Sequence, residues 1–136
     1  MSEIQLRPTV ATDLSRLMGF DHSIKSDSVW QLELRRENGQ VTSTFREVRL
    51  PREARVEYPR TAAQIFEGFE QTRDVFLTAV LDGTPVGYLH LSDQVAPRTV
   101  WVKDWVVRGD LRLRGIGAAL LLAGLDWSAE GGFRRI

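Results

Sequence analysis

Three residues in the C-terminal part of the chain, Arg112, Gly115 and Gly117, have types and a spacing that suit the binding of an anion. They follow the β-branched, apolar stretch 99–107 and precede a long apolar segment with the composition of a helix. The first turn of a helix leaves backbone N–H groups without partners and carries partial positive charge. Glycines at that point remove the side chains that would keep an anion away. The pattern therefore predicts a phosphate or pyrophosphate site in the loop 112–118.

Two nucleotide-binding motifs with similar glycines do not fit this loop. A Walker A loop needs G-x-x-x-x-G-K-[ST], but Gly109 and Gly115 are one residue too far apart and Ile116 stands where the lysine is needed. A dinucleotide fingerprint needs G-x-G-x-x-G/A, and Leu120 stands at its third small position. The anion is therefore not predicted to belong to a nucleotide held by either motif.

The spacing does match [Q/R]-x-x-G-x-[G/A], which resembles the acyl-CoA pyrophosphate loop of the GNAT superfamily of N-acyltransferases. Arg112, Gly115 and Gly117 agree with every fixed position of that motif. The alternative is a helix start whose glycines only allow close packing against a strand.

Other parts of the chain are similar to the same family. Residues 4–8 resemble its opening strand, and residues 75–91, with a turn at 82–84, resemble its central hairpin. The resemblance covers about 3–22 and 74–136. A glycine motif placed in this order, after this hairpin, is more specific than the motif alone.

The resemblance implies an α/β (α+β) fold with a central, mostly antiparallel mixed sheet flanked by helices. We expect one GNAT-like domain over 1–136, with an inserted hairpin at about 29–50. Relative to the family pattern the sequence is expected to be C-terminally truncated at Ile136, without the last strands and helix. That part of relatives commonly carries a tyrosine that protonates the departing thiolate, and neither Tyr58 nor Tyr88 matches its position.

The activity that the resemblance implies is transfer of an acetyl group from acetyl-CoA, as co-substrate, to an amine of an unknown acceptor. The alternative is a non-catalytic remnant of the fold that acts as a binding or assembly module. By position in the motif, main-chain groups of Trp105, Val106 and Val107 would hold the pantetheine arm. The residues implied at the pyrophosphate are Arg112, Leu113, Arg114, Gly115, Ile116, Gly117 and Ala118. Arg112 and Arg114 would add positive charge, although Arg114 could equally lie in solvent.

Asp104 is the candidate general base, because it directly precedes the implied pantetheine segment and relatives often carry an acidic residue there. The alternative is that Asp104 pairs with a nearby arginine. Glu33 is a distant second candidate. His90, on the neighbouring strand, could relay a proton or could be purely structural. Two histidines without any cysteine make a metal site unexpected.

Composition excludes several classes of protein. Eighteen basic and eighteen acidic residues balance, which argues against a nucleic-acid or anionic-membrane partner. The absence of cysteine excludes disulfides and thiolate metal sites. The N-terminal sequence does not read as a signal peptide and no apolar run is long enough to span a membrane, so a cytoplasmic location is expected.

Two elements can be placed from local signals. Asn38-Gly39 predicts a tight hairpin turn that pairs Leu32 with Phe45 across the strands. Carboxylates of this hairpin could attract a cationic amine or could simply be solvated. Residues 116–130 predict a helix that is apolar nearly all round and therefore buried.

A homodimer is also expected from the sequence. Residues 99–107 would be nearly an edge strand, flanked only by 133–136, and an apolar edge can pair with another chain. Strict alternation places Trp101 and Trp105 on one face of this strand and Val100, Val102 and Val106 on the other.

Overall fold

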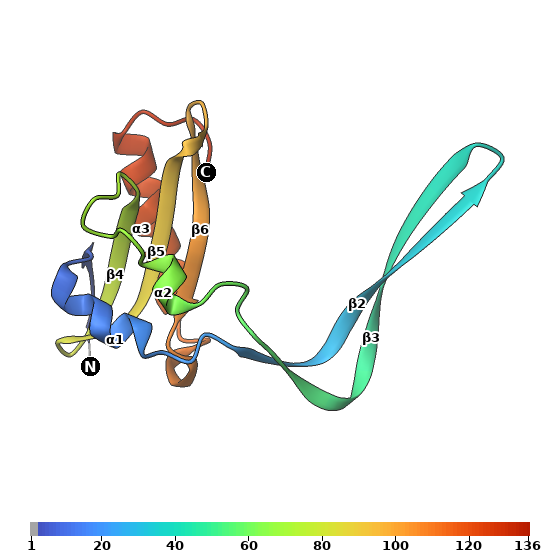
Figure 1. Cartoon of the computed structure of the whole chain (residues 1–136), viewed down its shortest axis with the longest axis horizontal. Coiled ribbons are helices and arrows are strands. Elements are labelled where there is room, and N and C mark those ends of the chain that lie inside the picture. The colour runs from blue at the N-terminus through green and yellow to red at the C-terminus, as the bar shows by residue number, and fades with distance from the viewer. Residues whose placement is uncertain (1–2) are drawn as a thin grey trace. The chain divides into compact units, whose positions relative to one another are not determined.

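The computed structural model describes residues 3–136 and divides the chain into two compact units. One unit consists of Met1–His22 with Pro59–Ile136, and the other is Ser23–Tyr58 (Figure 1). The elements of the first unit are β1 (Ile4–Pro8), η1 (Ala11–Asp13), α1 (Leu14–Met18), α2 (Ala62–Ile65), β4 (Val75–Leu81), β5 (Thr84–Ala96), β6 (Thr99–Val107), η2 (Gly109–Leu111) and α3 (Ile116–Glu130). The second unit contains β2 (Ile24–Glu37) and β3 (Gln40–Val56).

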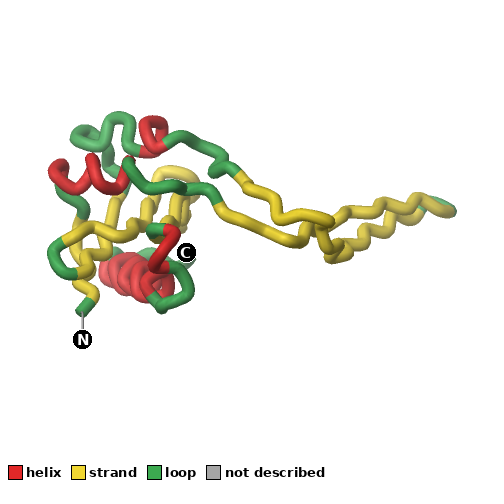
Figure 2. The backbone as a smooth tube through the Cα atoms, turned by 90° about the horizontal axis from the view of Figure 1, so that it is seen from below, coloured by secondary structure: helices red, strands yellow, loops and turns green. Residues whose placement is uncertain are grey.

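The first unit is a four-stranded sheet in the order β1-β4-β5-β6, with every neighbouring pair antiparallel. The long helix α3 covers one face of this sheet, and the short helices α1 and α2 lie on the other (Figure 2). The expected mixed α/β architecture with an antiparallel sheet is thereby confirmed.

The core under α3 forms where this helix packs on β5. Leu89, Leu91 and Leu120 are fully buried there. At Gly124 an added Cβ would lie 2.6 Å from Leu89 Cδ2, so only glycine allows this close approach of helix and sheet. The expectation that α3 is buried all round is wrong, because one sheet face covers only one side of a helix. Its opposite side leaves Leu122 61% exposed.

A β-bulge in β6 decides which face of the sheet its side chains occupy. Leu91 pairs with Val102, whereas His90 pairs with Asp104, so Lys103 is the extra residue. Val102 packs against the core under α3, and beyond the bulge Asp104 shares the opposite face with His90. One inserted residue reverses the alternation of a strand.

The bulge also corrects the predicted placement of the two tryptophans of β6. Trp101 pairs with Ser92 on the face of His90, whereas Trp105 pairs with Leu89 on the α3 face. They therefore lie on opposite faces, and the prediction of a shared face is wrong because it assumed uninterrupted alternation.

The second unit is one long antiparallel hairpin. Its turn has positive φ at Asn38 (48°) and Gly39 (77°), and Leu32 pairs with Phe45, both as predicted. The hairpin extends beyond the expected 29–50, because Ile24–Ser26 pairs with residues 54–56 past an irregularity in the register.

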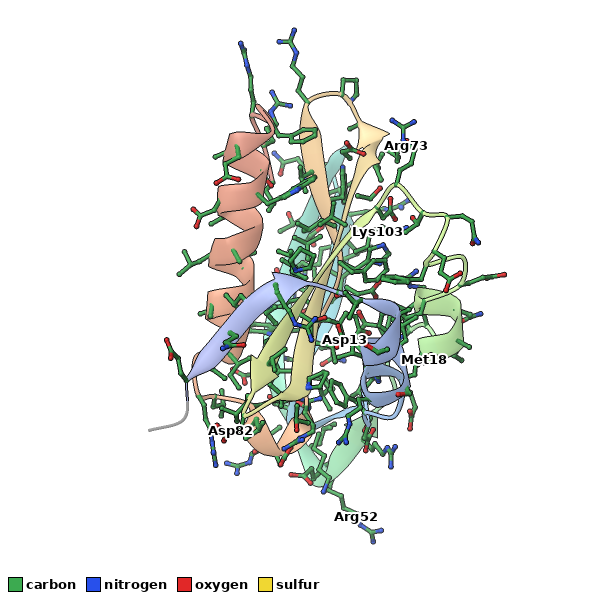
Figure 3. All side chains as sticks on the ribbon, turned by 90° about the vertical axis from the view of Figure 1, so that its left-hand side faces the viewer. Asp13, Met18, Arg52, Arg73, Asp82 and Lys103 are labelled. Atoms are coloured by element: carbon green, nitrogen blue, oxygen red, sulfur yellow. The ribbon has the colours of Figure 1, made fainter. Side chains whose placement is uncertain are left out.

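A partly buried ion pair between Arg7 and Asp13 connects β1 to the start of α1, where Asp13 lies (Figure 3). Arg7 donates two hydrogen bonds to the Asp13 carboxylate, at 2.6 and 2.8 Å, and the Val10 N–H donates a third at 2.9 Å. The hydrogen bonds from Arg7 hold the pKa of Asp13 below its ordinary value, although burial opposes them.

We expect Asp13→Asn to lower the free energy of unfolding by about 1–3 kcal/mol at pH 7, the usual range for loss of charge-assisted hydrogen bonds. A carboxylate whose pKa is depressed by folding contributes stability above its unfolded pKa, and this contribution is lost as the pH falls through the folded pKa. Urea unfolding of both proteins between pH 7 and pH 2 should therefore show the gap closing in acid. A gap that stays constant with pH would show that the Asp13 charge contributes nothing.

Candidate functional site

The loop between β6 and α3 has an unusual backbone. Leu111 is buried and anchors the loop, after which Leu113 (φ 63°) and Gly115 (φ 86°) both adopt the left-handed conformation. The Leu113 side chain is fully exposed. Only glycine adopts the Gly115 conformation without strain, and an added Cβ there would meet no atom within 4 Å. The loop therefore leaves open space beside the start of α3.

The N-terminus of α3 is uncapped by any side chain. Gly115 is its N-cap residue, and the first α-helical hydrogen bond runs from the Ala119 N–H to the Gly115 carbonyl, at 3.0 Å. The N–H groups of Ile116, Gly117 and Ala118 consequently have no acceptor within the helix. No acidic residue lies in this first turn to compensate the helix dipole. These amides can bind an anion.

The Arg112 side chain donates hydrogen bonds to main-chain carbonyls, whereas its charge suggested a place beside the pyrophosphate. Its Nε donates to the Val107 carbonyl at 3.0 Å, and its Nη2 donates to the Asp21 carbonyl at 3.5 Å. The guanidinium thus ties the loop to the end of β6. Arg114 is exposed.

Trp105 joins β6 to the first turn of α3. Its indole Nε1 donates to the Gly117 carbonyl at 2.9 Å, and an added Cβ at Gly117 would lie 3.4 Å from that same nitrogen. The structure therefore brings the two predicted segments, 105–107 and 112–118, into direct contact. Among the residues that the structure describes, the outer edge of β6 pairs only through a bridge between Thr99 and Arg135.

Asp104 lies on the other face of the sheet and is 2% exposed. Arg60 forms an ion pair with its Oδ2, and His90 Nδ1 lies 2.8 Å from the same oxygen. The alternative that Asp104 pairs with an arginine is thus correct. The pairing fixes the position of the Asp104 carboxylate.

Asp104, Arg60 and His90 belong to a polar cluster that continues from His90 toward the surface. His90 Nε2 lies 2.8 Å from Asp74 Oδ2, and Lys103 Nζ lies 3.5 Å from that oxygen. The Phe76 ring stacks on His90 with centroids 4.0 Å apart. His90 is thereby held between two carboxylates and beneath an aromatic ring.

Asp74 is held ionised by its neighbours. Burial raises the pKa of Asp74, but hydrogen bonds from His90 and Ser92, together with the charges of His90 and Lys103, leave that pKa below its ordinary value. A cavity of about 100 Å³ borders Asp74, His90 and Lys103.

Arg60 and Asp74 are two residues of this cluster that the sequence did not indicate. Arg60 and Asp104 are 44 residues apart, and Asp74 and His90 are 16 apart, so no local pattern connects them. Glu33, the second candidate base, belongs to the hairpin unit, where its Oε1 lies 3.4 Å from Arg35 Nε. Within residues 3–136 there is no group of histidine and acidic side chains that could hold a metal ion.

The antiparallel sheet, the edge strand β6 and the glycine-rich, uncapped start of α3 are the features that the sequence resemblance led us to expect of an acyltransferase. The sequence model of the family described as "Acetyltransferase (GNAT) family" matches residues 40–136. The chain therefore belongs to the GNAT acetyltransferase family, whose members are N-acetyltransferases. No curated protein matches the sequence.

Two solved structures are similar to this chain. The putative streptothricin acetyltransferase from Bacillus anthracis str. Ames, in complex with acetyl coenzyme A, has 18% identity and a TM-score of 0.69, over 96% of this chain and 71% of that one. Nourseothricin acetyltransferase has 22% identity and a TM-score of 0.74, over 96% and 69% of the two chains. At these identities the likeness shows a shared fold. In the described part of the chain no helix is both long and apolar enough to cross a membrane.

Proposed function

We propose that this protein transfers an acetyl group from acetyl-CoA to an amine of its acceptor. The observation that carries the proposal is the uncapped N-terminus of α3, with glycines at 115 and 117, in contact with the end of β6. A pyrophosphate carries two negative charges on oxygens that accept hydrogen bonds, and these free amides are donors of matching geometry. The acetyl-CoA-bound neighbour supports the same co-substrate.

Each predicted cofactor residue has a role in this proposal. The main-chain N–H groups of residues 113–118 bind the pyrophosphate, and the Arg114 side chain adds positive charge from the exposed side of the loop. Arg112 holds the loop in register with β6. The main-chain groups of Trp105, Val106 and Val107 pair with the amides of the pantetheine arm along the outer edge of β6, as an added strand would.

In the transfer step, the amine nitrogen attacks the thioester carbonyl carbon. The carbon–sulfur bond breaks, coenzyme A leaves as a thiolate that takes a proton from solvent, and the amine loses a proton to a base. The transient oxyanion needs an N–H donor, and the edge of β6 offers backbone N–H groups.

Asp104 is the proposed base, one residue before the pantetheine segment. Arg60 and His90 hold its carboxylate in place.

The same pairing favours a second candidate function. A carboxylate buried against an arginine is a poor base, and a protein with an intact pyrophosphate loop but no base binds acyl-CoA without transferring its acyl group. That protein is a binding or assembly module. This binding module differs from the enzyme only because it does not transfer the acyl group to an amine.

Calorimetric titration with acetyl-CoA tests the binding step. We expect one acetyl-CoA per chain, with coenzyme A binding to a similar extent because both carry the pyrophosphate. Release of free thiol in the presence of small primary amines then tests transfer. No binding at millimolar ligand would contradict both functions, whereas binding without thiol release on any amine would leave the binding module.

A further inference from the structure

The hairpin unit has two chemically different faces. Residues directly opposite each other in an antiparallel pair share a face, and alternate residues share it along each strand. One face therefore carries a group of large apolar side chains, each at least 50% exposed, which we call the apolar face: Trp30, Leu32, Leu34, Val41 and Phe45. The opposite face is polar between the same limits, with Gln31, Glu33, Arg35, Thr42, Thr44 and Arg46.

This unit has no core of its own. No residue from Ser23 to Tyr58 is buried, although its strands run for 14 and 17 residues. An isolated two-stranded hairpin is marginally stable in water, and exposed apolar surface on this scale marks an interface. The apolar face therefore needs an occupant.

The charges at the two ends of the apolar face identify that occupant. Arg36 lies beside Val41 near the turn. At the other end of this face Glu47 lies beside Trp30, and Arg49, opposite Ser28, follows it outside the apolar group. When two copies of the face stack about a two-fold axis perpendicular to the strands, Arg36 of each copy approaches Glu47 of the other at both ends. The opposite orientation would bring arginine against arginine. The face is complementary to itself in charge as well as in its apolar centre.

We propose that a second copy of this chain covers the apolar face, so that the protein is a homodimer held together by two hairpins packed face to face with their strands reversed. Ten large side chains at about 100 Å² each bury on the order of 1,000 Å² in total, which reaches the lower limit for a specific interface. This surface replaces the edge of β6 as the expected dimer contact, because the proposed pantetheine site needs that edge free. The dimer itself does not depend on acetyl transfer.

Sedimentation velocity at about 50 µM tests the dimer with a matched pair of variants. Phe45→Glu places a charge at the centre of the apolar face, and Thr44→Glu places the same charge one residue away on the polar face. We expect the wild type and Thr44→Glu to sediment as dimers and Phe45→Glu as a monomer. A monomeric wild type would overturn the proposal, and so would a dimeric Phe45→Glu.

A cross-linking experiment tests the reversed orientation. Because the chain contains no cysteine, thiols introduced singly at Arg36 and at Glu47 are the only ones available. Packed sheets lie about 10 Å apart, so a bifunctional thiol reagent of that span joins facing residues. We expect covalent dimers when Arg36→Cys and Glu47→Cys chains are mixed, and none from Arg36→Cys alone. Efficient cross-linking of Arg36→Cys to itself, or none in the mixture, would overturn the arrangement.

Discussion

Gly117→Glu is expected to abolish acetyl-CoA binding. The substitution places a side chain and a negative charge in the first turn of α3, where we propose that the amides of residues 116–118 bind the pyrophosphate. Repulsion between like charges brought together in a site costs several kcal/mol, so affinity should fall at least about 100-fold. Calorimetric titration of wild type and variant with acetyl-CoA measures this directly.

Loss of folding cannot account for that result. A glutamate in the first turn of a helix interacts favourably with the helix dipole, and a Cβ at Gly117 meets Trp105 only at 3.4 Å. The melting temperature of Gly117→Glu should therefore stay close to that of the wild type. Gly109→Glu is the matched control, because it adds the same charge at an exposed position with open space around it. An affinity within a few-fold of wild type in Gly117→Glu would remove the loop as the pyrophosphate site.

Asp104→Asn is expected to lower turnover by about 10²–10⁴-fold, the usual size for loss of a general base, with little change in acetyl-CoA affinity. The amide keeps the shape of the side chain but accepts no proton. Steady-state kinetics on the best amine acceptor, combined with titration of acetyl-CoA, separates the two effects. The acidic limb of the pH–rate profile should disappear in the variant.

The ion pair with Arg60 requires a structural control for this prediction. Removing the charge of Asp104 leaves Arg60 facing a neutral amide, which destabilises the fold. Asp74→Asn removes the carboxylate on the other side of His90 and leaves Asp104 untouched, so it should cost less than about 10-fold in turnover. If both variants lose turnover equally, or if Asp104→Asn keeps the wild-type pH–rate profile, Asp104 serves structure alone.

Local signals in the sequence were sufficient for the features that depend on a few neighbouring residues. Asn38-Gly39 predicted the hairpin turn because that turn needs positive φ at both positions, which few residue pairs tolerate. The spacing of Gly115 and Gly117 predicted an open helix start, because a backbone with positive φ and without side chains is a local property. The mostly antiparallel sheet was implied by the family resemblance and had no such local signal.

The contacts between distant residues, and the faces on which the β6 side chains lie, were decided by the tertiary structure. Arg60 and Asp74 reach Asp104 and His90 only because β5 and β6 pair in one register and the segment before β4 packs on the face that carries His90. No pattern of spacing in the sequence encodes these contacts. A single bulge at Lys103 then sends Asp104 to the face opposite Val102, against the alternation that the sequence predicts. Glycine spacing predicted the open start of α3, because the end of a helix depends on a few neighbouring residues. The partners of the candidate base depended on how distant strands align, because side-chain contacts across a sheet arise only when the whole chain has folded.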